Sequence, residues 1–105
     1  MSIPRGKEFP DRPPVHPGEV LLEEFLRPMA MSQTRAAEQM AMPLNRLNEI
    51  VRGKRGVSAE TALRLSELFG TTPQFWLNMQ VAVDLYRARG DSGRRRTELS
   101  EASPR

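Results

Sequence analysis

The sequence contains no cysteine, and it has only one histidine, one tryptophan and one tyrosine in 105 residues. Without cysteine the chain can form neither a disulfide nor a thiolate zinc site, which agrees with a reducing compartment. No apolar run approaches the roughly 20 residues that span a bilayer. Residues 1–14 contain four prolines and lack the apolar stretch of a signal peptide. We therefore expect a cytoplasmic protein.

The residue types that catalysis requires are also scarce. His16, the only histidine, precedes a proline at a predicted helix start, where capping or packing suits it better than acid–base chemistry. Glu23 and Glu24 are adjacent, so they point in different directions on a helix. The sequence shows no glycine-rich phosphate loop and no nucleophile motif. We expect neither an enzyme nor a cofactor or metal site.

The net charge of +3 is small, but basic residues are concentrated in two places. One is the C-terminal segment 87–105, which holds six arginines. The other lies in the middle of an otherwise near-neutral stretch and consists of Arg46, Arg52, Lys54 and Arg55. A local basic group on a near-neutral domain is typical of a protein that docks in a nucleic-acid groove. An ordinary solvated helix face would carry the same charges, so both interpretations stay open here.

Length and apolar content predict one small all-α domain, residues 15–89, between two segments of low apolar content. The proline-rich segment 1–14 is expected to be a flexible arm, and 90–105 a disordered tail. Apolar periodicity and capping residues predict five helices in the domain. Their expected ranges are 17–27, 33–40, 43–52, 59–69 and 73–88. Ser32 and Ser58 are the expected N-caps of the second and fourth.

The last predicted helix has a wider apolar surface than one core contact needs. Trp76, Met79, Val83 and Tyr86 form one stripe, and Phe75, Leu77, Val81, Ala82 and Leu85 add apolar side chains around it. Either the helix is buried on most sides, or part of it packs against another chain. We favour the second interpretation, and the predicted interface of a homodimer consists of Phe75, Trp76, Met79, Val83 and Tyr86.

Residues 33–52 have the pattern of a helix-turn-helix unit, in which a short helix, a tight turn and a second helix follow one another. Small or apolar residues occupy the offsets at which two such helices must pack. These residues are Ala36, Ala37, Met40, Leu47 and Ile50. A single match would carry no weight, whereas all five together indicate this unit.

When those inward residues are set aside, the second helix of the unit keeps a largely polar face. In major grooves, Arg can contact guanine, Asn adenine, Glu cytosine and an apolar group the thymine methyl. Asn is a poor helix former, so two of them on one face favour base contacts over an ordinary polar surface. The predicted base-reading residues are Leu44, Asn45, Arg46, Asn48 and Glu49.

Phosphate contacts would hold such a helix in position on double-stranded DNA. Gln33 begins the first helix of the unit, and three cations follow the second helix. The predicted phosphate-binding residues are Gln33, Arg52, Lys54 and Arg55. For Lys54 and Arg55 a plain surface turn is the alternative interpretation.

Several motifs, most of them outside this unit, make the sequence resemble one family. They are His16–Glu19, Glu24–Leu26, Met31–Thr34, Ile50–Ser58, Thr61–Leu65, Phe69–Thr71 and Pro73–Gln80. Over about residues 15–88 the chain resembles the HigA-type (VapI-like) antitoxins of the Xre (Cro/C1-like) helix-turn-helix superfamily. The resemblance implies a lambda-repressor-like bundle of five helices and a homodimer. It also implies a palindromic operator in the protein's own promoter and a partner toxin, usually an RelE-like ribonuclease.

Two positions depart from the superfamily pattern. Ala41 stands where glycine is usual, because this turn tends to need a positive φ, and Ala36 stands where a larger aliphatic residue is common. The turn either holds Ala41 in the left-handed region, at a cost of roughly 1 kcal/mol, or takes another shape that Pro43 imposes.

Two other functions remain compatible with the sequence. One is a free-standing transcriptional repressor without a toxin partner, which only the neighbouring gene would distinguish from an antitoxin. The other is a protein-interaction module with no DNA function. The Asn- and Arg-bearing helix face argues against the second.

Overall fold

The structure, a computed structural model, describes the backbone of residues 13–102 and the side chains of residues 13–90. Within the described range the chain is helical and has no strand. The helices are α1 (Pro17–Val20), η2 (Leu21–Leu26), α2 (Gln33–Gln39), α3 (Leu44–Val51), α4 (Ala59–Phe69) and α5 (Pro73–Ala102). Since η2 continues α1 without a break, these elements form the five helical segments that the sequence predicts.

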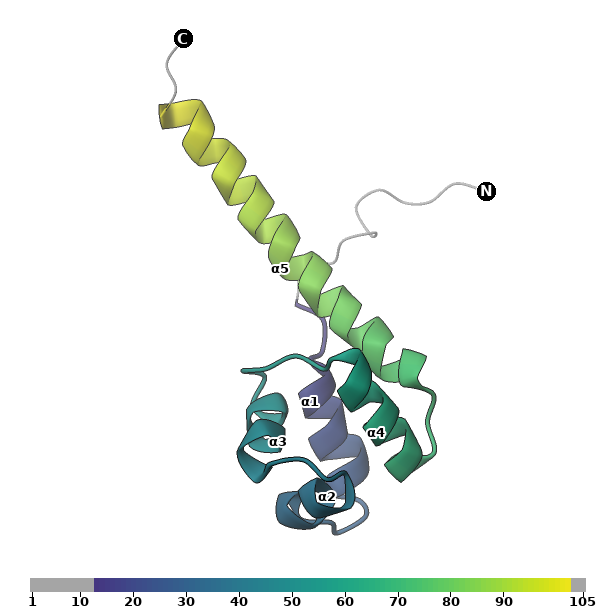
Figure 1. Ribbon diagram of the computed structural model, residues 1–105. Helices are drawn as coiled ribbons and strands as arrows, with labels where there is room; N and C mark the ends of the chain where they lie inside the picture. Colours follow the sequence, from purple (N-terminus) through teal and green to yellow (C-terminus); the bar gives the residue numbers. More distant parts are fainter. Residues whose placement is uncertain (1–12, 103–105) are drawn as a thin grey trace, which may run out of the picture.

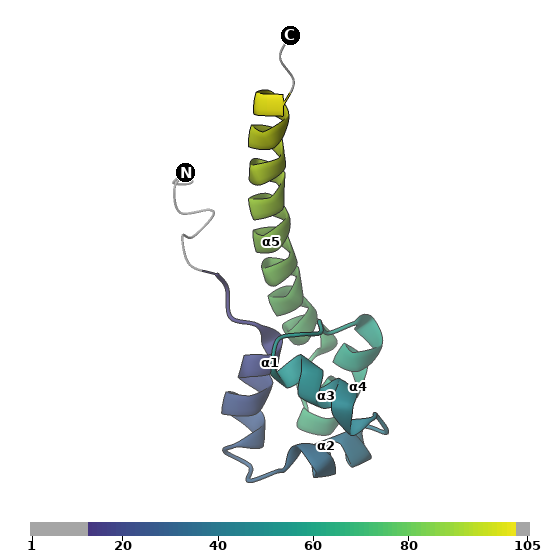
Figure 2. The same ribbon diagram turned by 90° about the vertical axis from the view of Figure 1, so that its left-hand side faces the viewer.

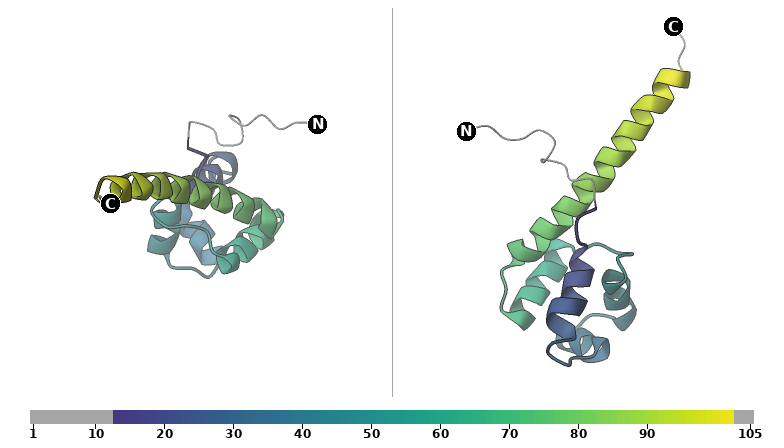
Figure 3. Two further views of the ribbon diagram at one scale, coloured as in Figure 1. Left: turned by 90° about the horizontal axis from the view of Figure 1, so that it is seen from above. Right: turned by 180° about the vertical axis from the view of Figure 1, so that it is seen from behind.

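The first four segments form one body from which α5 projects (Figure 1). α2 packs on α3, α1 packs on α3, and the first part of α5 packs on α4 and α1. The rest of α5 extends away from the body in a straight line, and it does so in both side views (Figures 1 and 2). Seen from above, α5 crosses over the body, whose helices lie beneath it (Figure 3).

The core lies where these helices meet. Its fully buried apolar side chains include Leu21, Leu26, Leu47, Ile50, Leu65 and Trp76. Residues of the helix-turn-helix unit that the sequence assigns to the inside are all buried, namely Ala36, Ala37, Met40, Leu47 and Ile50. The packing pattern of the unit is therefore confirmed at each of its five offsets.

Side-chain caps begin four of the helices, and the sequence predicts Ser32 and Ser58 among them. At the start of α5, Thr72 Oγ1 accepts a hydrogen bond from Phe75 N at 3.2 Å. Ser32 Oγ accepts a hydrogen bond from Arg35 N at 3.0 Å, and Ser58 Oγ accepts one from Thr61 N at 3.2 Å. His16 Nδ1 accepts a hydrogen bond from Gly18 N at 2.9 Å. Each cap satisfies a backbone N–H that has no partner within its own helix. The single histidine is thus a structural capping residue of α1.

The first helix differs from the sequence expectation in its hydrogen bonding. Its second half, η2, is π-helical, and Arg27 N donates to Leu22 O, five residues earlier, at 2.9 Å. The periodicity of apolar residues predicts a helix here but cannot separate π from α hydrogen bonding over a single turn.

The last helix is longer than expected. We predicted its end near Ala88 and a disordered tail over 90–105, whereas α5 continues to Ala102. The polar composition of the tail suggested disorder, but Arg, Ala, Leu and Glu are good helix formers. The first proline after Pro73 is Pro104, so no proline interrupts the helix. The predicted N-terminal arm, 1–14, lies outside the described residues except for its last two positions.

The turn between α2 and α3 holds Ala41 at a φ of 52°, in the left-handed region. The first of the two alternatives for this turn is therefore the correct one. Arg64 of α4 stabilises the turn, because its Nη1 donates to Met40 O at 2.7 Å and to Ala41 O at 2.8 Å. The sequence contains no signal for this role of Arg64, since the contact joins residues more than 20 positions apart.

Replacing Ala41 by glycine should raise the free energy of unfolding by about 0.5–1 kcal/mol. Glycine adopts a positive φ without the steric cost that alanine has there. The free energy gained by removing this cost exceeds the entropic cost of ordering a more flexible residue on folding. The matched control is Ala88→Gly at an exposed site inside α5, where glycine should cost about 1 kcal/mol. Thermal melts of both variants test this; equal losses would show that Ala41 is not left-handed in solution.

No helix in the described part of the chain has the length and apolar character needed to cross a membrane.

Candidate DNA interface

The orientation of α3 follows from its burial pattern. Leu47 and Ile50 are buried against the body, and each residue of an α-helix is rotated by about 100° from the last. The side opposite Leu47 and Ile50 therefore points away from the body. It carries Asn45, Asn48, Glu49 and Arg52. α3 thus presents a continuous polar ridge, flanked by Leu44 on the side of α2.

Arg46 is placed differently from the other predicted base-reading residues. It is half-buried, whereas Asn45 beside it is exposed, and its position on the helix wheel puts it on the flank far from α2. The centre of the outward ridge is therefore Asn45 rather than Arg46.

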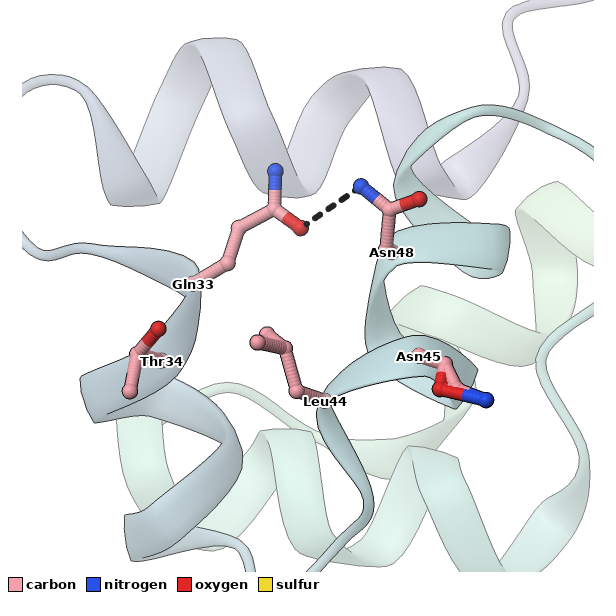
Figure 4. A pocket seen from close by; sticks show the side chains of 5 residues that line it. All are labelled: Gln33, Thr34, Leu44, Asn45 and Asn48. Atoms are coloured by element: carbon pink, nitrogen blue, oxygen red, sulfur yellow. Dashed lines mark hydrogen bonds between the residues drawn. The ribbon is translucent and has the colours of Figure 1, made fainter.

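Gln33 and Asn48 connect the two helices of the unit. The Asn48 amide, Nδ2, donates a hydrogen bond to Gln33 Oε1 at 3.3 Å. Figure 4 shows the two side chains reaching toward each other from α2 and α3. One residue predicted to bind phosphate and one predicted to read a base are thus brought together as a pair of amides.

Glu49 and Arg55 are also brought together. Glu49 Oε1 lies 2.8 Å from both Nε and Nη2 of Arg55. Both side chains are about half exposed, so the pair contributes on the order of 1 kcal/mol or less to stability. In this arrangement Arg55 neutralises Glu49 and points toward α3. The sequence predicts separate roles for the two residues and does not reveal their pairing.

The chain reverses direction immediately after α3. Gly53 has a φ of 73°, which ends the helix as the sequence predicts. Arg52 and Lys54 flank this turn with exposed side chains. They add positive charge at one end of the polar ridge, where a phosphate strand beside a bound helix would run.

A very close backbone contact sets the position of α3 against α1. Gly18 is buried, and a Cβ atom at this position would lie 1.8 Å from Ile50 O. Only a residue without a side chain allows the two backbones to approach so closely. The conformation of Gly18 itself is ordinary helix, so it is the contact and not φ that requires glycine.

His16 lies beside this contact, within about 4 Å of the site at which Gly53 would carry a Cβ. Burial lowers the pKa of His16 below its usual value, and nearby Arg87 lowers it further, while Asp84 and Glu19 oppose the shift. The neutral form is the one whose Nδ1 can accept the hydrogen bond from Gly18 N. The capping role and the lowered pKa therefore agree.

The predicted dimer interface needs a correction. Trp76 is fully buried and Val83 nearly so, both within the protomer itself. The Trp76 ring packs against Phe25 and Phe75 at centroid distances of 5.3 and 5.0 Å, and its Nε1 donates to Thr71 Oγ1 at 2.7 Å. The apolar band of α5 is wide because one side fills the core. Sequence periodicity alone could not tell that side from the exposed one.

The remaining three residues are at least partly accessible: Phe75 and Tyr86 are exposed, and Met79 is half-buried. Two further exposed apolar residues of α5 lie outside the predicted interface set, Val81 at 52% exposure and Leu85 at 61%. The exposed side of α5 therefore retains an apolar surface, displaced around the helix from the predicted stripe.

Gln80 is a residue whose role the sequence prediction missed. It is only 7% exposed; its Oε1 accepts a hydrogen bond from Val57 N at 2.8 Å, and its Nε2 donates to Asp84 Oδ1 at 2.9 Å. Gly56 leaves room for this amide, since a Cβ there would lie 2.9 Å from Gln80 Nε2. Gln80 thereby ties α5 to the loop that follows α3. The sequence signal for this role of Gln80 was its position as a single amide on the Trp76 side of an otherwise apolar helix face.

Among the described residues, no group of three or more His, Cys, Asp or Glu side chains is arranged to hold a metal ion.

Comparison with known proteins places the chain among DNA-binding regulators. A family model described as Helix-turn-helix matches residues 22–76. Virulence-associated protein I of Dichelobacter nodosus is 50% identical over 91 residues, which cover 87% of this chain and 82% of that protein. Antitoxin HigA-1 of Vibrio cholerae is 43% identical over 79 residues, which cover 74% of this chain and 73% of that protein.

A solved structure of the Pseudomonas aeruginosa antitoxin HigA with the higBA promoter has the same fold, with a TM-score of 0.75 and 39% sequence identity. The match covers 78% of this chain and 89% of that one. Sequence motifs, helix arrangement and relatives thus agree, and they agree on a family of DNA-binding proteins and not of enzymes. The chain belongs to the helix-turn-helix family, in the Xre-like group that includes the HigA-type antitoxins.

Proposed function

We propose that this protein is the antitoxin and autorepressor of a toxin–antitoxin pair, and that it binds a palindromic operator as a dimer. The outward ridge of α3 carries the proposal, because it combines base-compatible side chains with an adjacent group of cations. The similarity to an antitoxin solved with its promoter supports the same assignment.

In this function α3 enters the major groove and its outward side chains meet base edges. Asn45, which is exposed at the centre of the ridge, makes a bidentate contact to adenine. Lys54, Arg52 and the Gln33 amide contact phosphates and fix the register of the helix. Arg55 joins them only when it leaves Glu49, since the two side chains are paired in the free protein.

Two alanine variants separate base contacts from phosphate contacts. Asn45→Ala should cost about 1–3 kcal/mol of operator affinity and relax the preference at one base pair. Lys54→Ala should weaken binding to all sequences alike and reduce the salt dependence by about one counterion. Titrations on cognate and scrambled duplexes at several salt concentrations measure both effects. Identical behaviour of the two variants would contradict the assigned roles.

The dimer is proposed to form through the exposed side of α5. This side carries the apolar residues Phe75, Val81, Ala82, Leu85 and Tyr86. Pairing of two copies would bury this surface and place two reading helices about 34 Å apart, one turn of DNA. The palindromic symmetry of the operator would then follow from the two-fold symmetry of the protein.

Leu85→Glu should convert the dimer to a monomer at micromolar concentration, because it introduces two carboxylates into an apolar interface. Leu63→Glu is the matched control, since Leu63 is a similarly exposed leucine on α4. Sedimentation of the wild type and both variants tests the prediction. If the wild-type protein sediments as a monomer, the proposed dimer is wrong, and the symmetry argument for a palindromic operator no longer applies.

For the toxin, we propose that acidic side chains outside the DNA-binding ridge attract a basic ribonuclease of the RelE-like type. The exposed carboxylates proposed for this role lie on the first helical segment, α4 and α5, and they are Glu19, Glu23, Glu24, Glu60, Glu67 and Asp84. Reversal of Glu23 and Glu24 to lysine should slow association with the toxin and leave operator binding intact. Glu38→Lys, at an exposed site on α2, is the control.

Co-purification with the product of the adjacent gene tests whether the toxin exists. A protein that binds its operator and captures no such product is a free-standing repressor. That function is the second candidate, and the same ridge of α3 supports it.

A further inference from the structure

Three cations follow the outward ridge of α3, and one of them is arranged differently from the other two. Arg52 and Lys54 are exposed, and within the described part of the chain neither has an ion-pair partner. Arg55 is instead paired with Glu49, whose Oε1 lies 2.8 Å from both Nε and Nη2 of Arg55. Two of the three positive charges are therefore available to phosphates in the free protein, and the third is neutralised.

Backbone hydrogen bonds keep the members of this pair next to each other. Lys54 N and Arg55 N both donate to the main-chain carbonyl of Glu49, at 2.8 and 3.2 Å. The turn after α3 therefore holds the backbone of Arg55 beside Glu49. Because these bonds use the carbonyl of Glu49 and not its carboxylate, a change of charge at the Glu49 side chain leaves the turn intact.

Arg55 leaves Glu49 without loss only where another hydrogen-bond donor replaces it. Phosphate groups cannot supply that donor, because their oxygens are acceptors and carry negative charge. A phosphate that attracts Arg55 therefore leaves the Glu49 carboxylate unpaired beside a second negative charge. The donors of the major groove are amino groups on base edges, N4 of cytosine and N6 of adenine. Both members of the pair can thus find new partners only where a phosphate strand and a base amino group are in reach together.

This requirement separates two kinds of complex. In a non-specific complex the contacts are with phosphates, so Glu49 gains no donor and Arg55 stays paired. On the operator, α3 lies in the major groove, where a base amino group can replace Arg55 at the carboxylate. Arg55 is then free to contact the phosphate strand beside the helix.

We propose that Glu49 keeps Arg55 from contacting the phosphates of non-specific DNA and releases it on the operator. This inference rests on the proposed operator binding and adds to it a pair of residues that determines specificity. The sequence predicts the two residues as independent contacts, whereas their pairing makes the phosphate contact of one depend on the surroundings of the other. The pair penalises the wrong DNA more than the right one, and specificity is that difference in affinity.

Glu49→Gln tests the first half of the proposal, since glutamine keeps the size of the side chain and removes its charge. On a scrambled duplex this variant should gain a phosphate contact from Arg55. The salt dependence should steepen by about 0.9 per protomer, and at about 0.1 M salt binding should tighten by up to about eight-fold per protomer.

Glu23→Gln is the matched control for this variant. Glu23 forms an ion pair with Arg27 at 3.2 Å on the first helical segment, so the control opens a similar pair and changes the net charge equally. Its salt dependence on the scrambled duplex should stay close to that of the wild type. A gain specific to Glu49→Gln is then a local effect at α3 and not an effect of net charge.

Removal of the whole pair tests the second half. The double variant Glu49→Gln/Arg55→Gln has the net charge of the wild type and should bind the scrambled duplex as the wild type does. The second probe is the palindrome that the wild type selects from a randomised duplex pool. On this probe the double variant should lose one phosphate contact per half-site, which lowers the salt dependence by about 0.9 per half-site. Thermal melts verify that the variants, which change half-exposed side chains, remain folded.

Two results would overturn this role of the pair while operator binding stands. One is a double variant whose salt dependence falls equally on both duplexes, because Arg55 would then contact phosphate in both complexes. The other is a Glu49→Gln protein that gains no more on the scrambled duplex than Glu23→Gln does. Failure of the wild type to select any palindrome would instead overturn the proposed operator binding, and the release of Arg55 on the operator with it.

Discussion

Substituting alanine for Gly18 should lower the free energy of unfolding by about 3 kcal/mol or more, which for a domain of this size lowers the melting temperature by about 12 °C or more. The added Cβ would overlap Ile50 O at 1.8 Å and would also approach Ile50 C at 2.7 Å. These are backbone atoms, so no change of side-chain rotamer relieves the overlap. The backbones of α1 and α3 must move apart instead.

The same change should reduce operator affinity more than the loss of stability explains, because α3 carries the base-reading residues. Gly90→Ala is the control: no atom lies within 4 Å of its added Cβ, and alanine inside α5 should stabilise the helix by up to about 1 kcal/mol. Melting curves and titrations at a temperature where both variants are folded separate the two effects. A Gly18→Ala melt close to that of the wild type would show that α1 and α3 are not in backbone contact.

Trp76→Ala should lower the free energy of unfolding by about 3–5 kcal/mol, the usual loss for a large aromatic side chain removed from a core. Trp76 is fully buried and packs on Phe25 and Phe75. The substitution also removes the hydrogen bond that Trp76 Nε1 donates to Thr71 Oγ1. The effect should appear in the stability of the monomer and not in the dimer dissociation constant.

Phe75→Ala should show the opposite pattern, since Phe75 is 40% exposed on the proposed dimer side. Its stability loss should be near 1 kcal/mol, with a larger change in the dimer dissociation constant. Trp76→Phe keeps most of the packing and remains measurable if the alanine variant does not fold. Denaturant titration and sedimentation distinguish the two roles. If Trp76→Phe weakened the dimer and left the stability unchanged, Trp76 would belong to the interface after all.

Local patterns in the sequence were sufficient for most of the fold. Serine before an apolar periodic run predicts a helix cap, and Ser32 and Ser58 are caps. Small residues at the crossing point predict the helix-turn-helix packing, and Ala36 and Ala37 are buried there. Such features depend on neighbours within a few positions, which is why a single sequence reveals them.

Features that depend on distant neighbours were not predictable. The side of α5 that packs on the body is decided by α1 and α4, so Trp76 was assigned to the wrong surface. The buried amide of Gln80 and the pairing of Arg64 with the α2–α3 turn join segments that lie 23 or more positions apart. For the DNA interface, the sequence predicted that Asn45, Asn48 and Glu49 point outward, but it could not show the flank position of Arg46 or the Glu49–Arg55 pair.

The bond between Gln80 and Val57 has a mechanical consequence. It fastens α5 near its beginning to the short loop that leaves α3, while α5 extends over 30 residues, about 45 Å at the usual rise of a helix. A helix of this length that is held near its start acts as a lever, so a displacement of its far end rotates the segment that is held. A partner that binds α5 far from the body and tilts it would therefore also rotate the loop that follows α3. The angle between α5 and α3 would then couple binding at the far end of α5 to DNA binding by α3.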